Sequence, residues 1–199
     1  MFGTVCTSAF RRLCAAFVLI VLAASELFAA SDGNLVAGVN VTEPIALPTT
    51  ITTAGAAVDL YDFDIVYPGG DGLGFTASQI VVNTSGTASA AQFGKITWHL
   101  DGPDAVDVIG VYAANTITFS ALTIALTDAS ADNYIISGHY NDNTGLTENA
   151  TFILSIDGDT DLTVGGGGTL MGATTPVCQR NRYDHPGDGD AARLCDTAG

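Results

Sequence analysis

The strongest constraint on the fold is a period-two alternation of apolar and polar residues between Val39 and about Val164. The apolar members occupy every second position in the clearest stretches (Ile96, Trp98 and Leu100; Ile117 and Phe119; Leu122, Ile124 and Leu126; Phe152, Leu154 and Ile156). Alternation of this kind places one face of each strand in a core and the other face towards solvent. Gly, Asp, Asn and Pro break the stretches, and these residues favour turns. The pattern therefore predicts an all-β chain without an amphipathic helix of useful length after the leader.

Short strands joined by turns are typical of an antiparallel β-sandwich of the immunoglobulin-like (Ig-like) type. Further strands are expected at four other positions (Val58–Tyr67, Ser78–Thr84, Val106–Tyr112 and Tyr134–Tyr140). Trp98 is expected to pack between the two sheets, because large aromatic side chains are mostly buried. We therefore predict a single antiparallel Ig-like β-sandwich over residues 31–176.

Residues 1–30 have the composition of a secretory signal peptide that is cleaved on export. Arg11 and Arg12 supply a positive n-region, and the apolar stretch Leu13–Ala24 follows them. At 1.5 Å per residue this stretch would reach about 18 Å as a helix, which is shorter than the ~30 Å hydrocarbon core of a bilayer. We expect cleavage after Ala29 or Ala30 and no membrane insertion of the mature chain. The predicted location is the cell surface or the extracellular space, with the periplasm as an alternative.

The sequence changes character near Val177, where the period-two pattern stops. Three of the four basic residues that follow the leader lie beyond this point (Arg180, Arg182 and Arg193). We predict an unstructured tail over residues 177–199. Cys178 and Cys195 both lie in this tail, and an oxidising compartment would allow a disulfide between them. A sharper hypothesis is that the tail is the out-of-frame or truncated end of a longer gene.

Acidic residues dominate the region from Ser31 to Val177, which contains sixteen Asp or Glu residues and a single Lys or Arg, Lys95. A surface of this charge repels phosphate backbones and anionic lipid headgroups, so nucleic acid is not expected as a partner. The same charge suits solubility, self-repulsion between copies and the binding of cations.

Two oxygen-rich turns are candidate metal sites. Asp157, Asp159 and Asp161 place three carboxylates at alternate positions, which suits a hard cation that prefers oxygen ligands. Asp142 and Asn143 belong to a second turn of this kind. The competing interpretation is a solvated turn in both cases, because Asp and Asn side chains hydrogen-bond to their own backbone. Calcium is the one cofactor that the sequence suggests, with the Asp157 group as the first candidate.

Enzymatic interpretations have little support in the sequence. His99 and His139 are predicted on the polar faces of strands, where a solvent-facing role is the simpler account. No serine or cysteine lies in the context of a nucleophile elbow. Paired carboxylates for glycoside hydrolysis stay open, because the sequence does not give their separation in space. We therefore expect a protein that is not an enzyme.

Five strings, taken in order, resemble a module that is repeated in very large secreted bacterial proteins and is called an Ig-like or adhesin-like repeat. They are short and span the predicted strands and turns (Ser78–Val81, Thr97–Ala105, Asn115–Ser120, Tyr140–Thr147 and Ser155–Thr163). The resemblance covers roughly residues 32–175 and implies a β-sandwich spacer or adhesion module, often in company with calcium-dependent export or surface display. It implies neighbouring repeat modules, or a cell-surface protein or glycan, as partners. This chain holds one copy where such proteins hold many.

Two functions are therefore carried forward. The first is a non-enzymatic extracytoplasmic structural or adhesion-type module, stabilised by calcium or formed as a truncated piece of a larger repeat protein. The alternative is a carbohydrate-binding module or a small glycan-active enzyme, since β-sandwiches also host these activities. A glycan binder is expected to expose a row of aromatic side chains, whereas Phe63, Tyr112, Tyr134 and Tyr140 lie in strand patterns that suit a core.

Overall fold

The structure is a computed structural model that describes residues 33–42, 44–69, 72–103, 106–165 and 171, together with the backbone of residues 177–184. The predicted signal peptide, residues 1–30, lies outside the described residues. None of the helices within the described ranges is long and apolar enough to cross a membrane.

The described chain is predominantly β, as the alternation predicts. Its strands are β1 to β11 (Asn34–Ala37, Ile45–Pro48, Val58–Tyr67, Phe75–Gly86, Ile96–Gly102, Val106–Ala113, Thr116–Leu126, Ser130–Tyr140, Thr151–Ile156, Leu162–Val164 and Val177–Asp184). Three single-turn helices lie between them (η1, Ala54–Ala56; α2, Ala90–Phe93; α3, Gly158–Asp161). Ser89 and Gln92 form a capping box at the start of α2, an arrangement that satisfies backbone N–H groups of the first helical turn.

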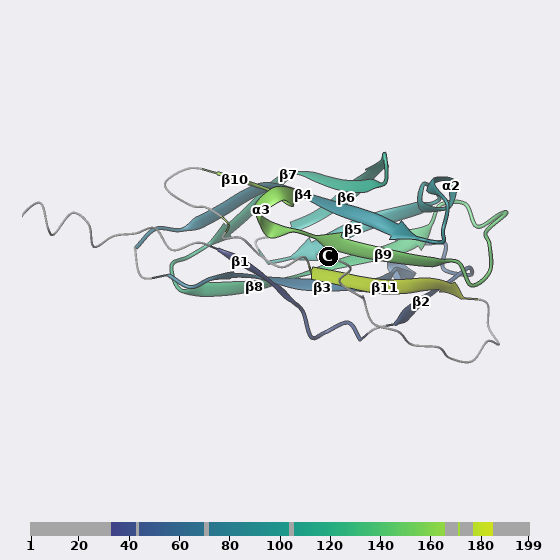
Figure 1. The fold of residues 1–199 in the computed structure, drawn as a ribbon, viewed down its shortest axis with the longest axis horizontal. Coiled ribbons are helices and arrows are strands. Elements are labelled where there is room, and N and C mark those ends of the chain that lie inside the picture. Colours follow the sequence, from purple (N-terminus) through teal and green to yellow (C-terminus); the bar gives the residue numbers. More distant parts are fainter. Residues whose placement is uncertain are drawn as a thin grey trace, which may run out of the picture. The chain divides into compact units, whose positions relative to one another are not determined.

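The strands form one sheet in the order β1-β3-β8-β5-β6-β7-β4-β9-β11-β2, and β10 pairs with β4 outside this path. Every pairing is antiparallel except that of β11 with β2. Strand β6 joins the two halves, because residues 106–110 pair with β5 whereas residues 111–113 pair with β7. The sheet curls until its ends meet, with β3 in contact with β2 and β11. In Figure 1, β4 and β7 lie above β3 and β8.

A single apolar core fills the inside of this curled sheet. The alternating residues identified in the sequence supply much of it, and Trp98, Phe119, Phe152 and Leu154 are fully buried. The Phe93 ring stacks on Tyr112 with centroids 5.4 Å apart and meets Phe152 edge to face at 6.1 Å. Offset and edge-to-face pairs of this kind add stability beyond the burial of apolar area. The predicted burial of Trp98 is therefore confirmed.

The segment after β1 is fixed to the sheet by one buried carboxylate. Asp62, on β3, is 3% exposed. Its two carboxylate oxygens accept hydrogen bonds from the backbone N–H groups of Asn40, at 2.7 Å, and Val41, at 3.2 Å. The backbone N–H of Gly38 donates a hydrogen bond to the backbone carbonyl of Asp62 at 3.1 Å. The ladder of hydrogen bonds between β1 and β3 ends at Ala37. Beyond it, the Asp62 carboxylate accepts the backbone N–H groups that would otherwise lack a partner strand.

Strand β11 differs from the unstructured tail that the sequence led us to expect over residues 177–199. Residues 177–182 pair with β9, and residues 181–184 pair with β2. The physical reason is that β4 covers only one edge of β9, and an open strand edge is a ready template for another strand. Residues 185–199 lie outside the described residues, and the predicted disulfide between Cys178 and Cys195 stays a prediction for that reason.

Candidate functional site

The first predicted calcium turn, at the end of β9, is held by its own hydrogen bonds. Asp157 is the N-cap residue of α3, and Asp161 is the last residue of that helix. The Asp161 Oδ2 atom accepts hydrogen bonds from the Asp157 backbone N–H, at 2.8 Å, and from the Asn83 amide, at 2.7 Å. Asp159 is exposed on the same turn. The structure thus brings the three predicted residues together in one turn and fixes the orientation of the Asp161 carboxylate.

In the second predicted turn, after β8, the Asp142 carboxylate forms an ion pair with a lysine side chain. The Lys95 ammonium lies 2.8 Å from Asp142 Oδ2, and the backbone and side chain of Thr144 donate to Asp142 Oδ1 at 2.9 and 2.7 Å. The hydrogen bond from Lys95, followed by those from Thr144, holds the pKa of Asp142 well below its usual range. The Asn143 amide donates to the Thr49 carbonyl at 3.0 Å. Lys95 therefore neutralises the Asp142 carboxylate in this turn.

The two predicted turns do not form one site. Asp142 and Asn143 precede β9, whereas the Asp157 turn follows it, so the length of the strand separates them. Within the part of the chain that the structure describes, no group of three or more His, Cys, Asp or Glu side chains is placed to hold a metal ion.

A third group of polar side chains lies on the outer face of the sheet, opposite the core. One row of directly paired residues crosses four strands, from Asp59 on β3 through Ser137 on β8 and His99 on β5 to Ile109 on β6. In the next row, Asp101 on β5 lies directly opposite Asp107 on β6. Because paired residues of neighbouring strands point to the same face, these side chains converge.

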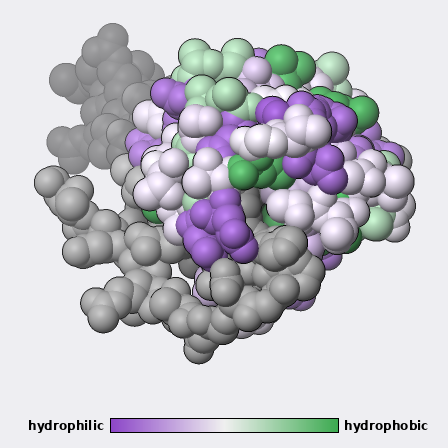
Figure 2. Space-filling model, turned by 90° about the vertical axis from the view of Figure 1, so that its right-hand side faces the viewer, coloured by the Kyte–Doolittle hydropathy of each residue, from purple (hydrophilic) through white to green (hydrophobic). Residues whose placement is uncertain are grey.

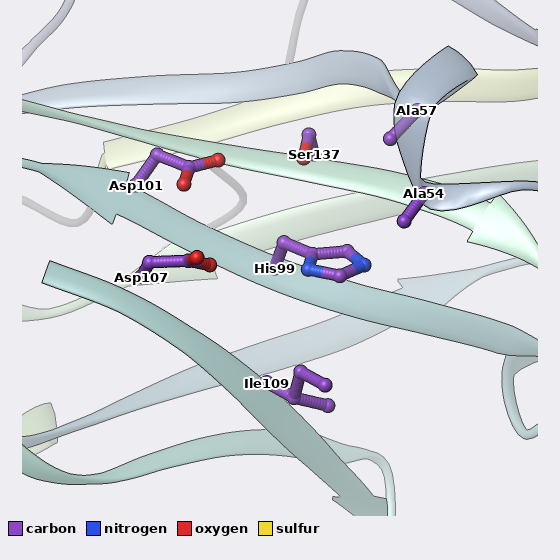
Figure 3. A pocket seen from close by; sticks show the side chains of 7 residues that line it. All are labelled: Ala54, Ala57, His99, Asp101, Asp107, Ile109 and Ser137. Carbon is purple, nitrogen blue, oxygen red and sulfur yellow. The ribbon is translucent and has the colours of Figure 1, made fainter.

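A pocket of about 400 Å³ opens on this outer face (Figure 3). Its lining comes from the η1 region and from strands β5, β6 and β8 (Ala54, Ala57, His99, Asp101, Asp107, Ile109 and Ser137). Figure 3 shows the Asp101 and Asp107 carboxylates, the His99 ring and the Ser137 hydroxyl side by side in this view. We refer to this hollow as the outer-face pocket.

Two histidines form a pair beside the outer-face pocket. The His99 Nε2 atom lies 3.2 Å from His139 Nδ1, and the rings stack with centroids 5.2 Å apart and planes 27° apart. Burial and, after it, the neighbouring His99 lower the pKa of His139 below its usual value. Both residues lie on the solvent side of their strands, as predicted, but each is half-buried against the other. The pairing was missed because it depends on the register between β5 and β8.

The pKa of the Asp101 carboxyl is shifted upwards, whereas that of His139 is shifted downwards. Burial raises the pKa of Asp101, Asp107 and Asp59 raise it further, and His99 acts against this shift. Two carboxylates on neighbouring strands, one with a raised pKa, provide two chemical options: they can bind a cation, or they can act as an acid and a base. The turn at Gly102–Pro103 was the sequence signal that could have placed Asp101 opposite Asp107.

The exposed apolar side chains are few and scattered. Ile109 and Val111, both on β6, are 61% and 67% exposed, and Val36, Val39 and Leu73 are also exposed. Figure 2 shows one face of the molecule, where hydrophobic residues lie in separate patches among hydrophilic ones. Ile109 is the member of this set that lines the outer-face pocket.

No family model, curated protein or solved structure matches the chain. The fold and the site define a mainly antiparallel all-β unit with an acidic, histidine-containing pocket on its outer face.

Proposed function

We propose that the chain is a non-enzymatic extracytoplasmic structural or adhesion-type module. The observation that carries the proposal is the position of the aromatic side chains. Every aromatic side chain that the structure describes is buried or half-buried, and none is exposed. Recognition of a glycan by stacking of sugar rings on exposed aromatic side chains is thereby disfavoured. The acidic polar face then becomes the contact surface in this proposal. In this proposal the leader, residues 1–30, directs the chain to the cell surface or the extracellular space.

The Ig-like sandwich is part of the same proposal. The crossing of β6 divides the sheet into the group β1, β3, β8 and β5 and the group β7, β4, β9, β11 and β2. Two mainly antiparallel groups with one apolar core between them support a β-sandwich arrangement. The resemblance to repeat modules of large secreted proteins adds neighbouring modules, or a cell-surface protein or glycan, to the proposal as partners. It also supports the hypothesis that the chain is a truncated piece of a larger repeat protein.

The glycan-active alternative has one observation in its favour. Asp101 and Asp107 lie opposite each other in a pocket, and the pKa of Asp101 is raised. Glycosidases pair a protonated carboxylic acid with a carboxylate. Against it, the pocket is lined by two alanines and an isoleucine and has no aromatic ring besides His99 on which a sugar could stack. Hydrolysis of a panel of nitrophenyl glycosides, lost in Asp101→Asn, would favour the enzyme over the structural module.

Calcium is proposed as a stabilising ion at the Asp157 turn and not at the Asp142 turn. The donor set supports this choice, since Asp161 is fixed in position and Asp159 is exposed beside it. Calcium prefers carboxylate and backbone oxygens. The Asp142 turn suits calcium less well because Lys95 already neutralises its carboxylate.

Thermal unfolding of the full chain in excess calcium, and then in excess chelator, tests this part of the proposal. An ion that binds only the folded state at a hundred times its dissociation constant adds roughly 2.7 kcal/mol. For a domain of this size the midpoint then rises by several degrees. Asp159→Asn should abolish the rise, and Asp142→Asn should leave it intact. Equal midpoints with calcium and with chelator would reduce the Asp157 turn to a solvated loop.

A further inference from the structure

We propose that the histidine pair, His99 and His139, binds a divalent first-row transition-metal ion of the zinc class through its two facing ring nitrogens. The inference rests on the distance between these nitrogens and on the strand pairing that places both residues. It goes beyond the proposed function, because nitrogen ligands select a different class of ion from the calcium proposed at the Asp157 turn.

The two rings are placed by the sheet and not by a loop. Thr97 on β5 pairs directly with His139 on β8, and His99 pairs with Ser137 two positions further along. The histidines are therefore diagonal neighbours on one face of two adjacent strands, within reach of each other's side chains. Each is half-buried, so part of each ring stays open to an ion from solvent. Ligands carried on strands hold a site more precisely than ligands carried on loops.

The distance between the facing nitrogens matches the separation of two ligands of one metal ion. His99 Nε2 lies 3.2 Å from His139 Nδ1. Two zinc–nitrogen bonds of about 2.0–2.1 Å at a tetrahedral angle place their nitrogens about 3.3–3.4 Å apart. A neutral imidazole can carry its proton on either nitrogen, so both rings can direct a lone pair into the space between them. A metal ion then takes the place of the proton that the two nitrogens share in a hydrogen bond.

The surroundings favour the form of the pair that a metal ion binds. Metal-ligating imidazoles must be deprotonated, and burial, followed by the charge of His99, lowers the pKa of His139. Three carboxylates, those of Asp59, Asp101 and Asp107, lie in the neighbouring rows of the same face. We assign them no role as ligands, but their negative charge raises the local concentration of cations.

The ligand set determines which ions fit. Imidazole nitrogen suits zinc, copper and nickel, whereas calcium and magnesium prefer oxygen. The described residues hold no group of three metal-ligating side chains, so water completes the coordination of an ion held by the two rings. The histidine pair is therefore expected to bind its ion reversibly.

Nuclear magnetic resonance titration of the full chain with zinc chloride at neutral pH tests the proposal. The expected result is saturable shifts of the ring protons of both His99 and His139, with the same midpoint. Calcium chloride at equal concentration should leave both rings unshifted. Because each ring is observed separately, the readout distinguishes this site from zinc bound by Cys178, Cys195 or His185.

Three variants provide the decisive comparison. His99→Gln and His139→Gln should each weaken zinc binding at the remaining ring by at least about tenfold, because the second ligand no longer acts within the same molecule. His185→Gln removes an imidazole outside the described residues and should leave the midpoint of both rings unchanged. Amide spectra without zinc check that each variant keeps its fold. Shifts of one ring alone, equal zinc affinity in His139→Gln and the unaltered chain, or equal shifts with calcium would each overturn the proposal.

Discussion

Asp62 and Gly38 depend on each other at the start of the described chain. The Asp62 carboxylate can accept backbone N–H groups of residues 40 and 41 only because the chain passes very close to it at Gly38. A Cβ atom built on Gly38 would lie 2.0 Å from Asp62 Oδ2 and 2.8 Å from the Asp62 carbonyl carbon. The carboxylate could rotate away, but the backbone carbon could not, so glycine is required here for close approach.

Gly38→Ala is therefore expected to lower the free energy of unfolding by about 1–3 kcal/mol, the usual range for overpacking. The matched control is Gly55→Ala in η1, where an added Cβ meets nothing within 4 Å. That variant should be neutral or slightly stabilising. Urea denaturation of both variants measures the difference, and equal stabilities would contradict the close contact at Asp62.

The histidine pair predicts a dependence of stability on pH. Because the pKa of His139 in the folded chain lies below the ordinary value of 6.5, the unfolded chain takes up the proton first as the pH falls. His139 therefore lowers the stability of the folded state as the pH falls from above 6.5 towards its folded pKa. The raised pKa of Asp101 acts in the opposite direction, and only at lower pH, between its folded pKa and 3.8.

The variant His139→Gln should accordingly lose less stability than the wild-type chain between about pH 7 and pH 5. Urea denaturation at three pH values in this window measures the effect. Titration of the ring protons of His99 and His139, with Asp59, Asp101 and Asp107 as the charged neighbours on the same face, gives the pKa directly. A His139 pKa at or above 6.5 would remove the physical basis of the prediction.

At the scale of the elements, β11 is the strand that closes the sheet path towards β2. It pairs with β9 over six positions and with β2 over four. Strand β2 has no other sheet partner among the described strands, so its place in the sheet depends on β11. The strands expected from the sequence cover β3 to β9 and omit β1, β2 and β10. Val177–Asp184 lacks the period-two alternation, and for that reason it was expected to belong to the tail.

A chain that ends at residue 176 tests the role of β11. In an antiparallel ladder, alternate residues direct their amides to opposite neighbours. Hydrogen exchange should therefore become faster at the β9 amides that face β11 and stay slow at those bonded to β4. The second set serves as the internal control. Uniform protection along β9 in the shortened chain would show that β11 does not pair with it in solution.

The sequence allows the strands to be predicted more readily than the sites, for a physical reason. Burial of Trp98 or Phe152 follows from spacing along one strand, and spacing is visible in the sequence. The contact of His99 with His139 needs the register of two strands forty residues apart, which spacing does not specify. Likewise, Lys95 lies far in sequence from the Asp142 turn, so the ion pair between Lys95 and Asp142 could not be predicted from spacing.

The described part of the molecule is an acidic all-β unit with buried or half-buried aromatic side chains and a pocket on its outer face. These features are the ones on which the proposed structural or adhesion-type function rests. A net charge of −15 at pH 7 keeps copies apart in solution and directs association towards basic partners. The proposed function places this unit outside the cytoplasm, and it therefore depends on export of the chain.

Export is tested by the location and mass of the full chain after expression in a bacterial host. Cells are fractionated, and the chain is weighed by mass spectrometry in each fraction. The expected result is recovery, outside the cytoplasm, of a chain that starts at residue 30 or 31 and lacks the mass of the leader. A full-length chain that stays in the cytoplasm, with residues 1–30 intact, would contradict the proposed extracytoplasmic function.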